Sequence, residues 1–248
     1  MKNLILLAFL GIIIIILYSC KNEPDFKFER GTKLIYQSDY RDSLNNLICS
    51  EELEFIGTGE KVHFSDRQDK IFYNFGISAT DSAKFVDQPR LYPDFTYSLS
   101  WQKTFGQGII QNENRIWLHP LRANQYRFTQ DCPFPEVRFP IEVGNKWETG
   151  GRTGTDFKTP ITSNYFVEKT DKYQGKIGTL RDCWYIKSSS TFNEKRNTLN
   201  MIFHKKKGFI LFEYILHNQD RITIELVGTS EVKEENYKLY EERDEHNR

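Results

Sequence analysis

The chain of 248 residues carries 34 basic and 34 acidic residues, so neither charge is in excess. This balance argues against nucleic acid as a partner, which needs a basic surface, and against an acidic store for cations. The 19 Phe, 13 Tyr and four Trp, against only two Met, favour strands, because aromatic side chains suit half-buried pleated surfaces.

The N-terminus has the layout of a cleaved export signal. Lys2 precedes an apolar run from Leu4 to Leu17, and the small residue Ser19 stands before Cys20. This Leu-Tyr-Ser-Cys ending resembles a bacterial lipobox. The resemblance implies diacylglyceryl transfer to the Cys20 thiol, cleavage after Ser19, and acylation of the new N-terminus by palmitate or a similar fatty acid.

Plain secretion and an uncleaved membrane helix are the alternatives. At a rise of ~1.5 Å per residue the apolar run spans about 24 Å, short of the ~30 Å hydrocarbon core, which favours cleavage. The polar run Lys21 to Asp25 is typical of a tether leaving a bilayer surface. We therefore expect a signal peptide over 1–19 and a lipidated tether over 20–30.

Acylation of Cys20 would leave Cys49, Cys132 and Cys183, of which at most two can pair. An exported compartment permits oxidation. A disulfide between Cys132 and Cys183 is our first expectation, and three free thiols are the alternative. No Cys-x-x-Cys or Cys-x-x-His pair occurs, so we expect no metal site and no cofactor.

Apolar residues alternate with polar ones through most of the remaining chain, which predicts strands with one buried face. In the first half the pattern covers Leu53 and Phe55, then Ile71 to Ile77, then Phe95 to Trp101. Between the first two, Gly57 to Glu60 predicts a turn.

The second half is more regular. Strands are expected over 163–171, 183–192, 198–205, 209–216 and 221–228, joined by short polar links typical of hairpins. The fold class predicted is mainly β. It consists of antiparallel meander sheets, curled or half-barrel-like, with little helix outside the signal segment and the C-terminal tail.

Proline is dense between residues 118 and 147, which favours extended crossing segments. We interpret this stretch as a connector between two β halves of one globular domain over 31–230. Residues 231–248 are charged, and either a frayed helix or disorder is expected there.

No catalytic signature with fixed spacing occurs, so we expect no catalytic residue. His119 and Arg122 could hold an anion, although the simpler interpretation is that their side chains fix the connector. The four Trp are better explained as core than as a ligand groove. The run Lys205 to Lys207 is either a solvated hairpin tip or a contact for anionic headgroups.

The stretches Trp117 to Arg122, Pro133 to Pro140 and Gly144 to Trp147 resemble uncharacterised lipoproteins of Bacteroidetes-type bacteria. Gly208 to Tyr214 and Ile224 to Leu226 look like the closing hairpin of the same group. The resemblance covers roughly residues 110–228. It implies an envelope location and a β-rich fold, and it carries no known activity.

The sequence therefore predicts a protein held in the cell envelope by a lipid anchor, with the outer membrane as its expected site. Its membrane face, and any protein or apolar ligand, stay undetermined at this point. The function expected is a non-catalytic binding or structural module. The alternatives are a carrier of an apolar ligand, for which a curled aromatic sheet is suited, and an unrecognised enzyme.

Overall fold

The computed structural model describes residues 25–63, 65–77, 102–154 and 158–245. These residues form one 12-stranded antiparallel sheet, in which nearly every strand pairs with its neighbour in the chain. The sheet order is β6-β5-β4-β3-β2-β1-β12-β11-β10-β9-β8-β7, so that the first and last strands of the chain pair at its centre. The mainly β meander predicted from the sequence is confirmed.

The strands are β1 (Thr32–Arg41), β2 (Leu47–Val62), β3 (Ser65–Phe75), β4 (Thr104–Gln111), β5 (Arg115–Leu118), β6 (Glu136–Arg138), β7 (Lys146–Thr153), β8 (Pro160–Gly175), β9 (Gly178–Phe192), β10 (Lys195–His204), β11 (Gly208–Ile215) and β12 (Arg221–Glu231). Two helices are described, the 3-10 helix η1 (Asn124–Asp131) and the helix α3 (Glu234–Glu245). The five C-terminal strands predicted from alternation are all present, most of them longer than expected. The strand predicted over Phe95 to Trp101 lies outside the described residues.

The turn predicted at Gly57 to Glu60 is wrong. Strand β2 runs through these residues, and its pairing with β3 shifts register between Gly57 and Lys61. Gly59 has a φ of +73°, so the glycines form a bulge within the strand instead of reversing it.

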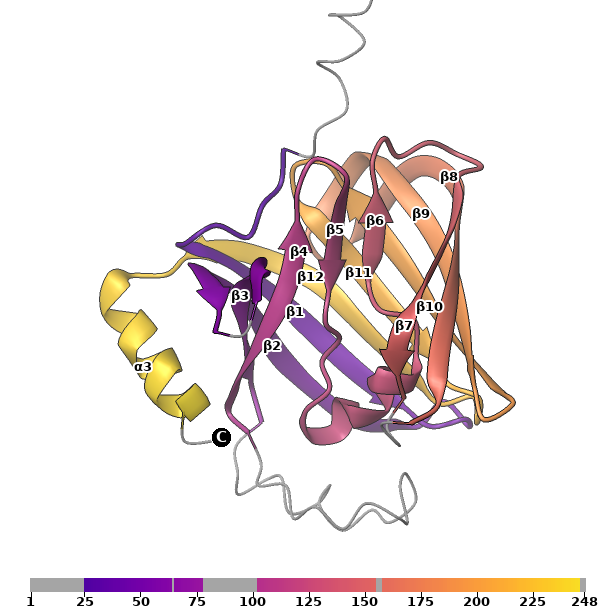
Figure 1. Ribbon diagram of the computed structural model, residues 1–248, viewed down its shortest axis with the longest axis horizontal. Coiled ribbons are helices and arrows are strands. Elements are labelled where there is room, and N and C mark those ends of the chain that lie inside the picture. The colour runs from indigo at the N-terminus through magenta and orange to yellow at the C-terminus, as the bar shows by residue number, and fades with distance from the viewer. Residues whose placement is uncertain (1–24, 64, 78–101, 155–157, 246–248) are drawn as a thin grey trace, which may run out of the picture.

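The sheet curls until its two edges meet (Figure 1). The edge strands β6 and β7 are consecutive in the chain, and the residues between Arg138 and Lys146 can span at most about 30 Å. Side chains bridge these two edge strands. Arg138 on β6 donates from Nη2 to Glu148 O at 3.0 Å and to Thr149 Oγ1 at 2.9 Å, both on β7. The Thr149 hydroxyl in turn donates to the Glu136 carboxylate on β6. Glu136 is fully buried, with Arg115 Nη1 3.5 Å and Arg138 Nε 3.0 Å away. The seam, by which we mean the junction of β6 and β7, is thus closed by side chains and not by backbone hydrogen bonds between the two strands.

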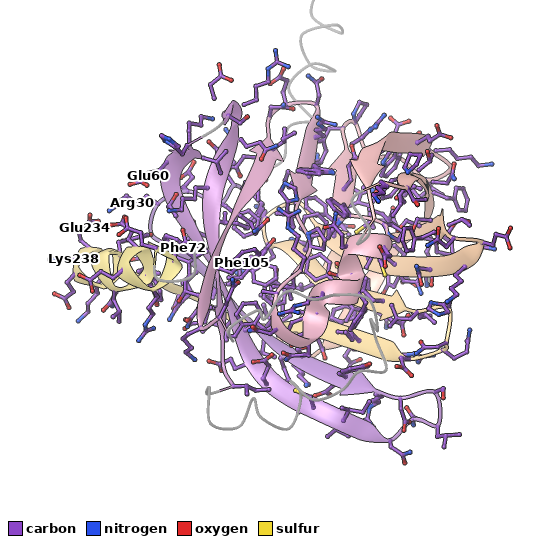
Figure 2. All side chains as sticks on the ribbon, turned by 60° about the horizontal axis from the view of Figure 1, so that its bottom comes forward. Arg30, Glu60, Phe72, Phe105, Glu234 and Lys238 are labelled. Carbon is purple, nitrogen blue, oxygen red and sulfur yellow. The ribbon has the colours of Figure 1, made fainter. Side chains whose placement is uncertain are left out.

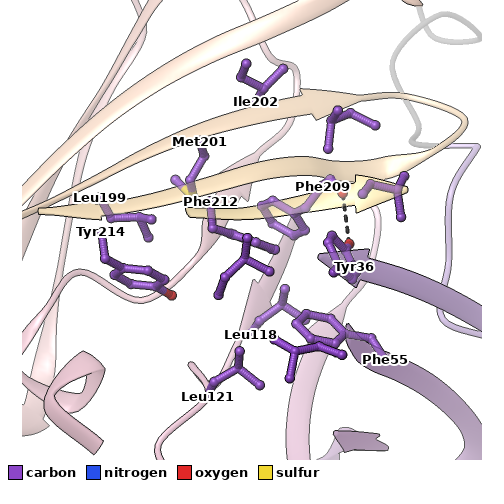
Figure 3. Packing of buried hydrophobic residues seen from close by; sticks show 14 of the residues in the cluster. Tyr36, Phe55, Leu118, Leu121, Leu199, Met201, Ile202, Phe209, Phe212 and Tyr214 are labelled. Atoms are coloured by element: carbon purple, nitrogen blue, oxygen red, sulfur yellow. Dashed lines mark hydrogen bonds between the residues drawn. The ribbon is translucent and has the colours of Figure 1, made fainter. Parts of the chain in front are cut away.

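The concave side of the curl holds one aromatic core (Figure 3). Phe55 lies with its ring centroid 4.5 Å from those of both Tyr36 and Tyr73, and Phe212 lies 5.1 Å from Phe209. The Tyr36 hydroxyl donates to Phe209 O at 2.8 Å, which satisfies the polar end of a fully buried ring. The alternation read from the sequence therefore places one face of each strand in this core.

Helix α3 covers the outer face of β2, β3 and β4. Tyr237 and Tyr240 are buried there against Ile56 and Phe72, in a small second cluster. Asp244 accepts the Gly106 amide at 2.8 Å on β4. Of the two alternatives for the tail, the structure shows a helix over 234–245. No helix within the described part of the chain is long and apolar enough to cross a membrane.

Candidate functional site at the two closed ends

The N-terminal segment, which we define as residues 26–31, runs past the upper end of the curl in Figure 1. Phe26 and Phe28 are buried in the core, with ring centroids 4.8 Å apart in an edge-to-face arrangement. Residues 26–30 of the expected tether therefore lie against the sheet. The alternation Phe26-Lys27-Phe28 was the signal in the sequence for this short extended segment.

Two residues of the sheet hold the N-terminal segment in place. Gln111 on β4 accepts the Phe28 amide at 2.9 Å and donates to Phe28 O at 3.3 Å, as a neighbouring strand would do. Gly208, after the β10–β11 turn, has a φ of +75°, and a Cβ there would lie 2.6 Å from the Phe26 ring. Phe26 thus lies against Gly208, the residue that directly follows the turn Lys205 to Lys207.

Helix α3 holds the other end of the N-terminal segment (Figure 2). The Tyr237 hydroxyl accepts the Gly31 amide at 2.6 Å and donates to Gly57 O at 2.7 Å. The Arg30 guanidinium lies 4.1 Å from the centre of the Tyr237 ring and forms an ion pair with Glu234. The segment is therefore clamped between the sheet and α3.

The lower end is closed by η1 over a buried polar layer. Glu51 on β2 is 5% exposed and accepts hydrogen bonds from Tyr126 at 2.7 Å, from the Ile77 amide at 2.9 Å and from the Gln125 side chain. The Tyr126 hydroxyl also lies 2.9 Å from Ser38 Oγ. Burial raises the pKa of Glu51 and outweighs the hydrogen bonds that lower it. This carboxyl group thus fixes η1 to β1 and β2.

The raised pKa of Glu51 predicts the sign of a pH effect. Because the folded state binds the Glu51 proton more tightly than the unfolded state, the stability from this group is complete below its usual value of 4.5 and is lost as pH rises through the folded pKa. The free energy of unfolding of the wild type, relative to the non-titrating Glu51→Gln, should therefore fall from acidic to neutral pH. Denaturant titrations across this range check it, and an advantage that grows with pH would contradict the assignment.

The thiols of Cys49 and Cys183 are not suited to nucleophilic chemistry. Burial, followed by the nearby Glu51 carboxyl, raises the pKa of Cys49 to about 12, so that the thiol stays protonated at neutral pH. Burial also raises the pKa of Cys183. A reactive cysteine needs the opposite environment, one that stabilises the thiolate.

The structure places no disulfide between Cys132 and Cys183, the first pairing expected, and Cys49, Cys132 and Cys183 are all buried. Ser190 Oγ donates to the carbonyl of Asp131, the residue before Cys132, at 2.8 Å. Ser190 and Cys183 lie seven residues apart on β9, about 23 Å along the strand. The two cysteines are therefore far outside the ~7 Å Cα separation that a disulfide requires.

His119 and Arg122 fix the connector in a way that differs from the expectation. The His119 imidazole packs against Trp117 and Phe134, and its Nδ1 is buried without a hydrogen-bond partner. Burial, with the Arg122 charge as a second cause, lowers the pKa of His119 to about 3, so the ring is neutral. The backbone makes the tie instead, because the Tyr73 hydroxyl donates to His119 O.

Arg122 reaches into the curl and donates to Gln107 Oε1 from Nε at 3.1 Å and from Nη2 at 2.8 Å.

The described tryptophans pack against buried residues, as the core interpretation predicts; they are Trp117, Trp147 and Trp184. Trp101 lies outside the described residues. Within the described ranges, no group of three or more His, Cys, Asp or Glu side chains is placed to hold a metal ion.

Comparison with known proteins adds no activity. No protein-family model matches the chain, and no curated protein matches it. Among solved structures, the chain is similar to a predicted lipoprotein from Parabacteroides distasonis, at 10% identity and a TM-score of 0.45 over 84% of this chain and 99% of that one. It is similar to a predicted exported protein with a YmcC-like fold from Bacteroides fragilis, at 8% identity and a TM-score of 0.43 over 83% and 98%. It is also similar to a β-barrel-like protein of a domain of unknown function from Brucella abortus, at 6% identity and a TM-score of 0.38 over 84% and 100%. At these values the likeness transfers no activity, partner or location to this chain.

Proposed function

We propose that the chain is a lipid-anchored protein of the cell envelope, held at the outer membrane through Cys20, and that it acts as a non-catalytic binding or structural module. The observation that carries the proposal is the burial of the Phe26 and Phe28 side chains in the core, which fixes the chain to the sheet a few residues after Cys20. Cys20 and Asp25 are five residues apart, a reach of at most about 18 Å. A lipid on Cys20 would hold the whole sheet close to the bilayer surface.

The chemistry of the buried groups supports a module without catalysis. Glu51 is committed to hydrogen bonds that hold η1, and Glu136 to those that close the seam. His119 is neutral and packed between aromatic rings, and the Cys49 thiol is protonated. These groups stabilise the fold, and the pKa values of His119 and Cys49 are shifted away from those that general acid–base or nucleophilic catalysis needs.

The carrier alternative is less well supported. A carrier needs an apolar space inside the curl, and the aromatic rings around Phe55 and Phe212 lie at contact distances from one another. Phe26 and Phe28 occupy the upper end, where a ligand would have to enter. A sheet used as a module needs neither the space nor the opening.

Replacing Cys20 tests the anchor. In cells fed a labelled fatty acid, the wild type should be labelled and recovered with membranes, and Cys20→Ser should be neither, because only the thiol accepts the diacylglyceryl group. Cys183→Ser is the matched control, since it removes a buried thiol and should keep full labelling. Equal labelling of the wild type and Cys20→Ser would overturn the proposal.

A further inference from the structure

We propose that the upper end of the curl binds the anionic headgroups of the membrane through a lysine rim, defined as Lys27, Lys206 and Lys207. This inference rests on the proposed lipid anchor and adds to it a lipid-binding surface. It also fixes which end of the domain faces the bilayer.

The position of the rim follows from the seat of the N-terminal segment. Phe26 lies against Gly208, which ends the turn that carries Lys206 and Lys207. Lys27 is exposed beside Phe26, and its side chain alternates with the buried rings of Phe26 and Phe28. Since residues 26–30 lie against the sheet, the point where the chain leaves for the bilayer lies next to all three lysines.

The charge of the rim suits an anionic surface. Lys206 is exposed, and none of the three rim lysines has a carboxylate within 4.0 Å among the described residues. Lys205 adds a fourth positive charge in the same turn. The acidic groups nearby are Asp25 and Glu29 in the N-terminal part of the chain, and Asp182, whose charge acts on His204. The three rim lysines carry no ion-pair partner within the part of the chain that the structure describes, and such lysines close to an anionic surface are attracted within about one Debye length.

The opposite end of β10, the strand that leads into the turn with Lys206 and Lys207, provides basic residues for a matched comparison. Lys195 and Arg196 are exposed at the start of β10, and His204 ends it. These ten residues extend over about 30 Å, so Lys195 and Arg196 should stay in water when the rim lies on the membrane.

Lysine acylation of the lipidated mature wild type, which begins at Cys20, tests the proposal. The protein is reconstituted into vesicles of zwitterionic lipid alone, or with an added anionic phospholipid, and treated with a water-soluble amine reagent. Mass spectrometry then reads the modification rate at each lysine. We expect Lys206 and Lys207 to react about fivefold more slowly on the anionic vesicles, Lys195 to be unchanged, and 1 M salt to remove the difference.

A charge-reversed variant shows whether the lysines are protected from the reagent by their charge or merely because the lipid anchor holds them near the vesicle. In Lys206→Glu/Lys207→Glu the protection of Lys27 on anionic vesicles should be lost, and in the control Lys195→Glu/Arg196→Glu it should remain. Equal reactivity of Lys206 on both vesicle types, in protein that floats with both, would overturn the rim while leaving the anchor intact. Failure to float with either vesicle would instead overturn the anchor.

Discussion

Replacing Phe212 by alanine is expected to destabilise the mature protein by about 3–5 kcal/mol. Phe212 on β11 is 2% exposed, and its ring contacts those of Tyr36, Phe55 and Phe209. Truncation leaves a cavity at the centre of the curl, where strands from both halves of the chain meet and cannot collapse independently. Guanidinium unfolding of the detergent-solubilised mature protein, followed by tryptophan fluorescence, measures the loss.

Phe166 provides the control for this substitution. Its side chain on β8 is 36% exposed, so Phe166→Ala removes less buried surface, leaves no enclosed cavity, and should cost only about 1–2 kcal/mol. Similar losses for the two variants would show that the core is not centred on Phe212.

The second large effect is expected from Gly57→Ala, at about 3 kcal/mol, because the new methyl group must displace the N-terminal segment. A Cβ at Gly57 would lie 2.3 Å from Glu29 O and 2.8 Å from the carbonyl carbon of Phe28. Both are backbone atoms and cannot rotate away. The segment should leave its seat, which exposes Phe28 and weakens the contact of Gly57 O with Tyr237.

Trypsin cleavage after Arg30 measures this displacement, alongside the free energy of unfolding. Cleavage should be much faster in Gly57→Ala than in the wild type. Gly228→Ala is the matched control, because a Cβ there meets only Ile35 Cδ1 at 4.0 Å and should change neither quantity. Cleavage at the wild-type rate in Gly57→Ala would contradict the packing of the N-terminal segment against Gly57.

The sequence was most informative where the environment is regular. In β12, Ile222, Ile224 and Leu226 alternate with polar residues, and this pattern identifies a strand with one buried face without reference to any partner. The short polar links between the later strands made the antiparallel meander predictable as well. Gly57 to Glu60 misled the prediction because glycine marks both turns and bulges, and the pairing of β2 with β3 on both sides of these residues distinguishes the two here.

The two closed ends were harder to predict, since their contacts join residues far apart in the chain. Gln111 binds the backbone of Phe28 across 83 residues, and Glu51 binds Tyr126 across 75. Nothing local distinguishes Glu51 from the exposed Glu52 beside it. The 3-10 helix η1 was missed because the prolines around it indicate extended chain, whereas burial against β2 decides its conformation.

The central claim is that the sheet is held on the membrane by a lipid on Cys20, a few residues before the buried Phe26. The intact mass of the protein extracted from the cell envelope tests this claim most directly. We predict a chain that begins at Cys20 and carries the added mass of a diacylglyceryl group and an N-linked fatty acid. A chain that retains residues 1–19, or one that begins with an unmodified residue, would contradict it.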